Sequence, residues 1–382
     1  MKRDIDRLMQ ERTLDAAVVT GPVKGNATMY YMVDGAALSH ALVLKRRGSD
    51  PVLLCASMER EEAALSGLQV VDTAKYNFQE LLKNAGGDRL KASVAYYRTI
   101  FEEFGISGRT GFYGQVAPGA SWVFLRELEK AVPGVTIVGE FLNDLFLTAR
   151  ETKGPEEITR IEKVAAITKE IVKATTDFMK SHRRKGRLFV KEDGTIFSIG
   201  RDAGIPHSRG NDRDPIELGK TIIFDIFPQE QAGGYFFDFT RTYVLGEASP
   251  QILAAYRELE ECYDTVAAKL KAGAAAAVYQ TLTCDFFEAQ GHETPRTNPQ
   301  VTNGYVHSLG HGIGLEIHEK PKLSDFAGND DVLAPGSVFT VEPGLYYPDK
   351  GFGMRIEDVY RVTDDGKVVN MTNYPRELVL DV

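Results

Sequence analysis

Two aspartates lie in the middle of apolar, strand-like runs, where a charged group is unusual. Asp225 is in the run 221–227 and Asp238 in the run 235–240. Burying a lone carboxylate costs several kcal/mol, so something must neutralise each of them. The residues between the runs, 229–234, have the composition of a hairpin turn, and folding them symmetrically predicts that Asp225 lies directly opposite Asp238. Carboxylates about 5 Å apart repel, and neither run contains Lys or Arg, so we expect a bound cation.

The same pattern returns near the C-terminus. A second pair of strand-like runs, 338–342 and 354–359, flanks a connection rich in Pro, Gly and Tyr. Folding that connection about residues 349–350 predicts that Glu342 lies opposite Glu357. The two hairpins together carry four negative charges, which two divalent cations would balance.

A fifth candidate ligand is His311, which stands between two glycines that allow the backbone to approach a site closely. A single acidic residue within a strand is more often a partly exposed residue or half of an ion pair. Four of them in mirrored hairpins, together with a histidine framed by glycines, favour a metal centre instead. The set of Asp, Asp, His, Glu and Glu predicts an oxygen-rich site for two metal ions.

Other chemistries fit the sequence less well. The glycines of 310–314 lack the G-x-G-x-x-G spacing of a dinucleotide-binding loop. His318 and Glu319 are followed by Lys320 and Pro321, so they do not complete the H-E-x-x-H helix of a zinc protease. No serine or cysteine lies in a recognisable nucleophile motif.

These residues resemble the M24 or "pita-bread" metallopeptidases, a family that includes aminopeptidase P, prolidase and methionine aminopeptidase. The resemblance covers most of the chain, and its motifs are 307–319, 340–346, 355–358 and 238–242. It implies that two metal ions are held by Asp225, Asp238, His311, Glu342 and Glu357.

The resemblance also implies roles outside the ligand set. His207 and His307 line the pocket for the residue after the scissile bond, and His318 contacts the substrate carbonyl or the tetrahedral intermediate. The catalytic group is expected to comprise Glu342, His318, His207 and Arg355, and the substrate-binding group His207, His307, His318, Tyr346 and Lys322.

Two of these residues have alternative interpretations. Arg355 precedes Glu357 by two residues and so points to the same strand face. It either orients a ligand carboxylate or the substrate carbonyl, or forms a structural ion pair with Asp238 or another acidic neighbour. Tyr346 matches a family tyrosine at the rim of the site, although ordinary packing would also explain it. His292 is expected to be a solvated loop residue without a role.

The resemblance to a two-metal peptidase predicts the reaction. A hydroxide bridging the ions attacks the peptide bond after the N-terminal residue, with Glu342 as both ligand and general base and His318 stabilising the oxyanion. Mn²⁺ is favoured because hard oxygen ligands dominate, with Co²⁺, Fe²⁺ and Zn²⁺ as alternatives.

Xaa-Pro peptides, cleaved in the manner of aminopeptidase P or prolidase, are the expected substrates. Prolidases of this type often have Arg where this chain has Lys322, and the family commonly has a small residue, usually Gly, where this chain has Phe227. The first departure replaces a bidentate carboxylate clamp with a point charge, and the second adds a ring to the pocket wall.

Length and composition fit a two-domain protein. The chain has 382 residues and a formal net charge of −9, and its one short basic cluster, 182–185, reads as a solvated helix end. The charge therefore argues against nucleic acid or an anionic membrane as partner, and the resemblance implies a small peptide substrate. The three widely spaced cysteines predict no disulfide framework. No apolar run approaches the roughly 18 residues of a membrane span, and the N-terminus is charged, so a cytoplasmic location is expected.

The fold expected is α+β, with an N-terminal α/β domain at 1–148, a linker at 149–155 and a catalytic domain at 156–382. In the first domain, Ile5, Leu8 and Met9 mark a helix, and further helices are expected near 89–103 and 120–131. Its strands are predicted at 14–20, 41–45, 51–55, 110–113 and 134–139. In the second, helices near 156–181, 250–271 and 276–290 cover a curved, antiparallel-rich sheet, which matches the pita-bread architecture.

By resemblance, the first domain contributes dimer contacts and the rim of the active site, and the protein is a homodimer. Two other functions remain as alternatives. One is a metal-free, creatinase-like amidinohydrolase, and the other is a non-catalytic interaction protein on the same fold. Relatives of both kinds lose metal ligands that this chain retains.

Overall fold

The computed structural model describes residues 4–181, 195–210, 215–231 and 233–381. The basic cluster 182–185 therefore lies outside the described residues. The chain forms two compact units. The N-terminal unit comprises Met1–Arg150 with Gln231–Gly234, and the C-terminal unit comprises Glu151–Glu230 with Tyr235–Val382.

The N-terminal unit contains a mixed sheet in the order β4-β3-β2-β1-β5-β6. Its strands are β1 (Ala16–Gly21), β2 (Ala41–Arg46), β3 (Val52–Cys55), β4 (Gln69–Asp72), β5 (Gly108–Gly114) and β6 (Val135–Val138). The pairs β1/β2 and β2/β3 are antiparallel, and the remaining neighbours are parallel. The helices are α1 (Ile5–Glu11), α2 (Ala27–Val33), α3 (Arg60–Ala64), α4 (Phe78–Asn84), α5 (Arg89–Phe104), α6 (Pro118–Ala131) and α7 (Leu145–Ala149), with short 3₁₀ turns at Ser57–Glu59 and Thr73–Tyr76.

One face of this sheet forms a core with α5 and α6, in which β-branched and leucine side chains of the strands meet aromatic residues of the helices. The pattern that predicted the first helix is confirmed, because Ile5, Leu8 and Met9 are all buried in α1. The predicted strands and long helices of this unit are present with ends shifted by a few residues. The short elements α2, α3, α4, α7 and β4 were not predicted.

The C-terminal unit is rich in antiparallel strands, which form three groups. Their orders are β11-β10-β12-β15-β16, β17-β9-β8-β7 and the hairpin β13-β14. The strands are β7 (Thr195–Ile199), β8 (Thr221–Ile226), β9 (Phe239–Leu245), β10 (Gly310–Gly312), β11 (Glu319–Leu323), β12 (Val338–Val341), β13 (Gly344–Tyr347), β14 (Phe352–Arg355), β15 (Asp358–Val362), β16 (Val368–Asn370) and β17 (Val379–Leu380). Short 3₁₀ turns lie at Asp202–Gly204 and Pro348–Lys350.

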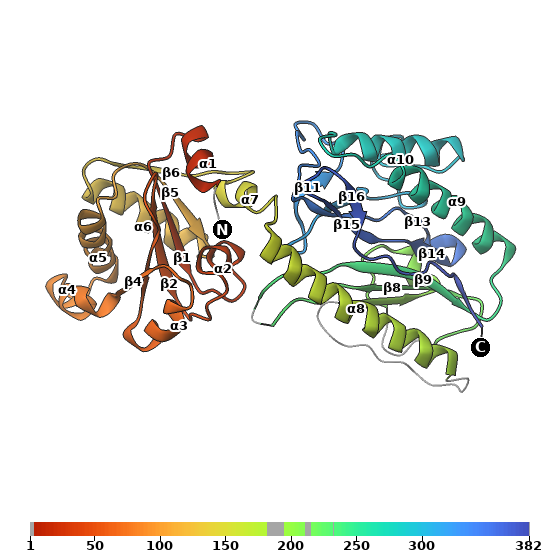
Figure 1. Cartoon of the computed structure of the whole chain (residues 1–382), viewed down its shortest axis with the longest axis horizontal. Helices are drawn as coiled ribbons and strands as arrows, with labels where there is room; N and C mark the ends of the chain where they lie inside the picture. The colour runs from red at the N-terminus through yellow and green to blue at the C-terminus, as the bar shows by residue number, and fades with distance from the viewer. Residues whose placement is uncertain (1–3, 182–194, 211–214, 232, 382) are drawn as a thin grey trace. The chain divides into compact units, whose positions relative to one another are not determined.

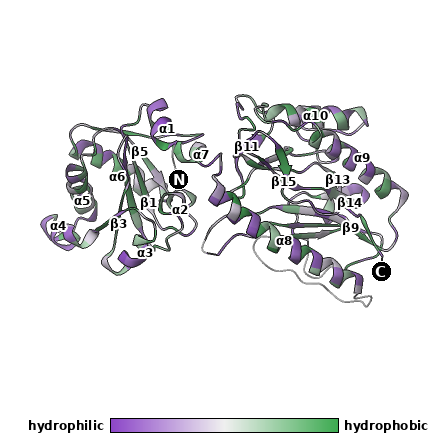
Figure 2. Cartoon of the chain, in the orientation of Figure 1, coloured by the Kyte–Doolittle hydropathy of each residue, from purple (hydrophilic) through white to green (hydrophobic). Residues whose placement is uncertain are grey.

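Three long helices cover these strands: α8 (Pro155–Ser181), α9 (Pro250–Ala267) and α10 (Ala277–Ala289). Within this unit, the strands lie between α8 on one side and α9 with α10 on the other (Figure 1). Figure 2 shows hydrophilic and hydrophobic residues alternating along α8, as expected for a helix with one buried face. Proline at the first position starts both α8 and α9, where its missing N–H is not needed.

Residues of the expected linker are tied into the C-terminal unit. Thr152 forms a β-bridge with Ser337, and the Lys153 backbone N–H donates to the Gly336 carbonyl. The Lys153 ammonium forms a 3.0 Å ion pair with Glu319, and both side chains are buried. This stretch therefore anchors the start of β11, the strand that follows His318.

A second buried ion pair fixes the strands that carry the acidic residues. Arg241 on β9 pairs with Asp358 at 2.7 Å, and the Arg241 side chain has 0% exposure. The same guanidinium donates to the backbone carbonyls of Thr240 and Glu357. Because a buried charge without its partner is strongly unfavourable, this pair specifies how β9 meets the start of β15.

Candidate metal centre

A cavity of about 670 Å³ opens within the C-terminal unit. It is lined by ten of the residues that the sequence singled out: Asp225, Asp238, His311, Glu342, Glu357, His207, His307, His318, Lys322 and Arg355. Phe227 also lies on its wall. Segments up to 150 residues apart in the chain thus meet at one small volume.

Strand ends deliver the acidic residues to this cavity. Asp225 is on β8, Asp238 directly precedes β9, Glu342 directly follows β12, and Glu357 lies between β14 and β15. His311 is the central residue of the short strand β10. Glycine is required beside it, because a Cβ at Gly312 would lie 1.9 Å from the Lys320 carbonyl oxygen and one at Gly310 would lie 2.2 Å from the Thr340 carbonyl oxygen.

The predicted register of the first hairpin is wrong by two residues. Asp225 pairs with Thr240, not with Asp238, and the bridge between Gln229 and Phe236 continues that register towards the turn. The turn is centred one residue later than the symmetric folding assumed. Because side chains alternate with a period of two, a shift of two residues leaves Asp238 on the same face as Asp225.

The register of the second hairpin agrees with the prediction. Val341 pairs with Asp358 on β12 and β15, and Gly344 pairs with Arg355 on β13 and β14. Both pairs lie in the register that sets Glu342 opposite Glu357. Tight pairing on either side of these two glutamates therefore holds them at the same level of the hairpin.

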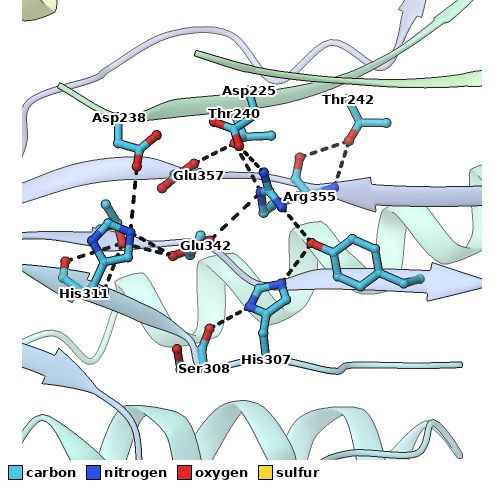
Figure 3. Close-up of polar contacts among 12 residues, drawn as sticks. Asp225, Asp238, Thr240, Thr242, His307, Ser308, His311, Glu342, Arg355 and Glu357 are labelled. Carbon is cyan, nitrogen blue, oxygen red and sulfur yellow. Dashed lines mark hydrogen bonds and ion pairs between the residues drawn. The ribbon is translucent and has the colours of Figure 1, made fainter. Parts of the chain in front are cut away.

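Three of the expected ligands form a compact set. Asp238, His311 and Glu357 each offer one ligand atom within 4.8 Å of the others, the only such group of three or more among the described residues. Glu342 joins them, because its Oε1 lies 3.3 Å from His311 Nε2, while Asp238 Oδ2 lies 3.7 Å from the same nitrogen. Figure 3 shows Asp238, Glu342, Glu357 and His311 directed towards one another.

The unsatisfied atoms of the site fit a cation. Asp225 Oδ1, Asp238 Oδ1 and Glu357 Oε1 are buried and have no hydrogen-bond partner among the described residues. Buried polar atoms are nearly always partnered, so three such oxygens at one cavity require a positive group.

The tautomer of His311 supports the same conclusion. Its Nδ1 lies 3.0 Å from the Gly312 carbonyl, which only accepts, so Nδ1 carries the hydrogen. Burial, followed by the neighbouring His318, lowers the pKa of His311 to about 3, so the ring is neutral. The Nε2 lone pair therefore faces the carboxyl groups of Asp238 and Glu342, an arrangement that a metal ion satisfies once both groups are ionised.

Burial raises the pKa of all four carboxyl groups of the site. It raises the pKa of Glu342 to about 8. Burial and then repulsion from neighbouring carboxylates raise the pKa of Asp238 and of Glu357 well above the usual range. Burial also raises the pKa of Asp225, although Arg355 opposes the shift. Without a cation the site would thus hold protons at neutral pH.

Arg355 contacts several polar groups of the site at once (Figure 3). Its Nη2 donates to Asp225 Oδ2 at 2.5 Å, and its Nε lies 4.0 Å from Glu342 Oε2. The partner of its ion pair is thus Asp225, and the two interpretations of Arg355 merge, because the buried pair also orients an expected ligand. Asp225 keeps its other oxygen for the cavity.

Tyr346 does not lie at the rim of the site. Its side chain is buried with 0% exposure, and its hydroxyl bonds both His307 Nε2 at 2.8 Å and Arg355 Nη1 at 3.0 Å. His307 Nδ1 donates to the Ser308 carbonyl, so Nε2 accepts from the tyrosine. Both nitrogens of His307 are therefore hydrogen-bonded, so its ring lines the cavity without a nitrogen available to the substrate.

The other expected substrate residues reach the cavity with exposed side chains. His318 lies beside His311, with ring centroids 4.3 Å apart and planes at 85°. Burial, and then the nearby His207, lowers the pKa of His318. Lys322 and His207 are exposed and line the same cavity. The Lys322 Nζ lies 5.9 Å from the centre of the Phe326 ring.

Two polar residues were misjudged or missed. His292 is not solvated, because its side chain is 13% exposed and bonds Glu258 through Nε2 and the Tyr347 hydroxyl through Nδ1. Gln280 on α10 is buried, and its Oε1 accepts from the Tyr305 hydroxyl and the Leu309 backbone N–H. It thereby anchors the segment that carries His307. A glutamine within the apolar stripe of a helix was the available signal.

Comparison with known proteins accords with this geometry. A family model described as metallopeptidase family M24 matches residues 148–364. A Xaa-Pro dipeptidase of Pyrococcus furiosus is 27% identical over 397 aligned residues, covering 99% of this chain and 100% of that protein.

Two solved structures share the fold over nearly the whole chain. A Xaa-Pro dipeptidase from Bacillus anthracis has a TM-score of 0.76 at 24% identity, covering 99% of both chains. An X-Pro aminopeptidase from Thermotoga maritima has a TM-score of 0.75 at 23% identity, covering 98% of this chain and 100% of that one. The predicted α+β fold, with a pita-bread domain following an α/β domain, is confirmed.

Proposed function

Because the chain belongs to metallopeptidase family M24 and is a metallo-exopeptidase, we propose that it hydrolyses the peptide bond between an N-terminal residue and a following proline. One observation carries this proposal. Asp238, His311 and Glu357 converge in a cavity where buried carboxylate oxygens have no partner among the described residues. The names of the similar dipeptidases and aminopeptidase support proline as the second residue.

We assign the metal-holding role to Asp225, Asp238, His311, Glu342 and Glu357. When bound there, divalent cations supply Lewis-acid polarisation of the scissile carbonyl and acidify a water molecule. Four carboxylates and one imidazole favour Mn²⁺ over a thiolate-type zinc site, with Co²⁺, Fe²⁺ and Zn²⁺ as alternatives. Two divalent ions would match the formal charge of the four carboxylates.

Glu342 is the proposed general base. Its side chain is 13% exposed, against 8% for Asp225 and 7% for Asp238. Water in the cavity can therefore reach it. Thr340 contacts its Oε1 at 3.3 Å, and Arg355 lies near its Oε2. These neighbours hold the carboxylate in place while it takes a proton from water and passes it to the leaving amine.

His318 is the proposed partner of the oxyanion. It is exposed at the cavity, next to His311, and its lowered pKa keeps it neutral at neutral pH. A neutral imidazole donates a hydrogen bond to a developing negative charge without competing as a cation. His207 and the ring of His307 would then contact the residue after the scissile bond.

The main experiment is hydrolysis of a free Xaa-Pro dipeptide, with MnCl₂ added, beside the same peptide carrying an N-acetyl group. An exopeptidase that recognises the free amino terminus cleaves the first and spares the second. A matched Xaa-Ala dipeptide tests the proline preference. Equal cleavage of the Xaa-Pro and Xaa-Ala peptides would contradict the proposed substrate class while leaving the peptidase activity in place.

Lys322 separates dipeptidase from aminopeptidase specificity. Its exposed ammonium lies at the cavity, and among the described residues it forms no ion pair with an acidic side chain. In a dipeptide the C-terminal carboxylate lies close to the scissile bond, so a cation at this place favours dipeptides. Lys322→Ala should raise KM for a Xaa-Pro dipeptide more than for a Xaa-Pro-Xaa tripeptide, and Lys322→Arg should preserve the ratio. Equal KM changes for both substrates would remove Lys322 from this role.

Two alternatives receive no specific support. A creatinase-like amidinohydrolase and a non-catalytic interaction protein would both tolerate loss of the metal ligands. All five ligand positions here hold residues of the expected type, and they meet at one cavity. Metal analysis of the purified protein also separates these functions.

The association state and location are further proposals. We propose a cytoplasmic homodimer in which the domain 1–148 contributes contacts and a rim to the active site, as the resemblance implied. Light scattering after gel filtration measures the dimer directly, and removal of residues 1–148 tests the domain's role. No helix among the described residues is long and apolar enough to span a bilayer.

A further inference from the structure

Two of the buried carboxylates of the site, Asp225 and Glu357, use their two oxygens in the same way. Asp225 gives Oδ2 to Arg355, and its Oδ1 has no partner among the described residues. Glu357 Oε2 accepts a hydrogen bond from the Thr240 hydroxyl, and Glu357 Oε1 likewise has no partner among the described residues. A carboxylate held through one oxygen presents the other in a fixed direction. The group that holds Glu357 is a threonine hydroxyl, which the sequence did not single out.

Thr240 occupies a central place between the two hairpins. It is the cross-strand partner of Asp225 on β8, and it forms an isolated β-bridge with Glu357. The Glu357 backbone N–H donates to the Thr240 carbonyl at 3.1 Å. The Thr240 side chain is fully buried with 0% exposure. Backbone and side chain of this one residue thus both contact the glutamate.

The direction of the hydroxyl bond follows from its neighbours. Arg355 Nε, which can only donate, lies 3.2 Å from Thr240 Oγ1. The oxygen therefore accepts from the guanidinium, and its single hydrogen is free to point to Glu357 Oε2 at 2.6 Å. Figure 3 shows Thr240 between Arg355 and Glu357. A donor already polarised by a cation forms a stronger bond to a carboxylate.

We propose that Thr240 is a positioning residue that orients Glu357 for metal binding, by holding Oε2 and leaving Oε1 for the cation. The inference rests on the proposed metal centre. Thr240 itself contacts neither metal nor substrate in this role. Its loss leaves Glu357 Oε2 without its donor and lets the carboxylate rotate, which lowers the affinity for the ion that Glu357 holds.

The test is calorimetric titration of the metal-free protein with MnCl₂. Thr240→Val keeps the shape of the side chain and removes the hydroxyl. Thr240→Ala also removes the hydroxyl, without placing a methyl group against Arg355. We expect Mn²⁺ to bind at least about 10-fold more weakly at one site in either variant, the usual effect of removing such a neighbour of a ligand. Thr240→Ser retains the hydroxyl and should restore an affinity within about 3-fold of the original.

Thr242 provides a matched control on the same strand and face. Its hydroxyl is also buried, and among the described residues it bonds only the backbone N–H and carbonyl of Arg355, each at 2.9 Å. Thr242→Val should lower the melting temperature without weakening Mn²⁺ binding comparably. Thermal unfolding shows which variants are folded, and either folded variant without the Thr240 hydroxyl suffices for the test.

The outcomes separate the inference from the proposed function. If the unsubstituted protein binds no Mn²⁺, the proposed metal centre itself fails. If it binds Mn²⁺ and both Thr240→Val and Thr240→Ala bind equally well, only the role of Thr240 is overturned. A loss as large in Thr242→Val as in Thr240→Val would also overturn it, since the effect would then be structural.

Discussion

Without its divalent cations, the protein should become less stable as the pH rises from about 7 to about 8. In the folded chain without metal, burial raises the pKa of Glu342 to about 8 and that of Asp238 and Glu357 well above the usual range. In the unfolded chain the same groups titrate near pH ~4. Between these values the folded chain holds protons that the unfolded chain has released. The free energy of unfolding therefore decreases as the pH rises through the folded pKa values.

Two histidines act in the opposite direction at lower pH, and this fixes the useful range. Burial lowers the pKa of His311 to about 3 and that of His307 to about 4. In the unfolded chain both titrate near pH ~6.5. Their contribution to stability increases with pH and is nearly complete at about pH 7. Above that pH the carboxyl groups dominate the pH dependence of the site.

The size of the effect follows from the linkage relation. For Glu342, a folded pKa of about 8 corresponds to a loss of about 1 kcal/mol across this range. Asp238 and Glu357 each add at most about 1.4 kcal/mol, the limit for one proton over one pH unit. Glu342 is only 13% exposed, so solvent screens little of its shift. The total of roughly 1 to 4 kcal/mol lowers Tm by roughly 2 to 16 °C for a unit of this size.

The assay is scanning calorimetry of the protein in EDTA and in excess Mn²⁺ at several pH values across the range. Groups away from the site titrate alike in both samples, so the difference between the curves reports the site. Metal binding requires ionised carboxylates and strengthens with pH, so Tm in Mn²⁺ should hold steady or rise relative to the metal-free sample. A metal-free sample whose Tm follows the Mn²⁺ sample throughout would refute the reasoning. In the metal-free Glu342→Gln variant, the free energy of unfolding should decrease by about 1 kcal/mol less over this pH range than in the unsubstituted protein.

Three substitutions test other parts of the account. Glu342→Gln should retain the fold yet lower kcat by at least about 100-fold, because it removes the proposed base; activity near that of the original protein would contradict its role. Asp238→Asn should reduce the number of Mn²⁺ ions bound per chain, measured by elemental analysis after dialysis, and an unchanged number would exclude Asp238 as a ligand. Arg241→Leu should cost about 3 to 5 kcal/mol of stability, because it leaves Asp358 buried without its partner; denaturant unfolding measures this loss, and a change below about 1 kcal/mol would show that the pair is not structurally important.

The sequence predicted the members of the site better than their contacts. Acidic residues in apolar runs were conspicuous, and the two-residue period of a strand kept Asp238 on the correct face even though its pairing was misassigned. The second hairpin was placed in the observed register because its two halves are of equal length about the turn.

What the sequence did not predict was how side chains meet across elements. The pairing of Arg355 with Asp225 and the burial of Tyr346 behind His307 depend on how segments distant in the chain meet. Local composition contains no information on that meeting. The same applies to His292, which resembles a loop residue in sequence but is held between Glu258 and Tyr347 by elements distant in the chain.

The most direct test of the metal centre is elemental analysis of the purified protein after reconstitution with Mn²⁺ and removal of free ions. The account predicts about two divalent ions per chain, coordinated in a crystal structure by the five assigned residues. An absence of bound metal after reconstitution would contradict it, as would ions bound away from the cavity that contains Asp238, His311 and Glu357.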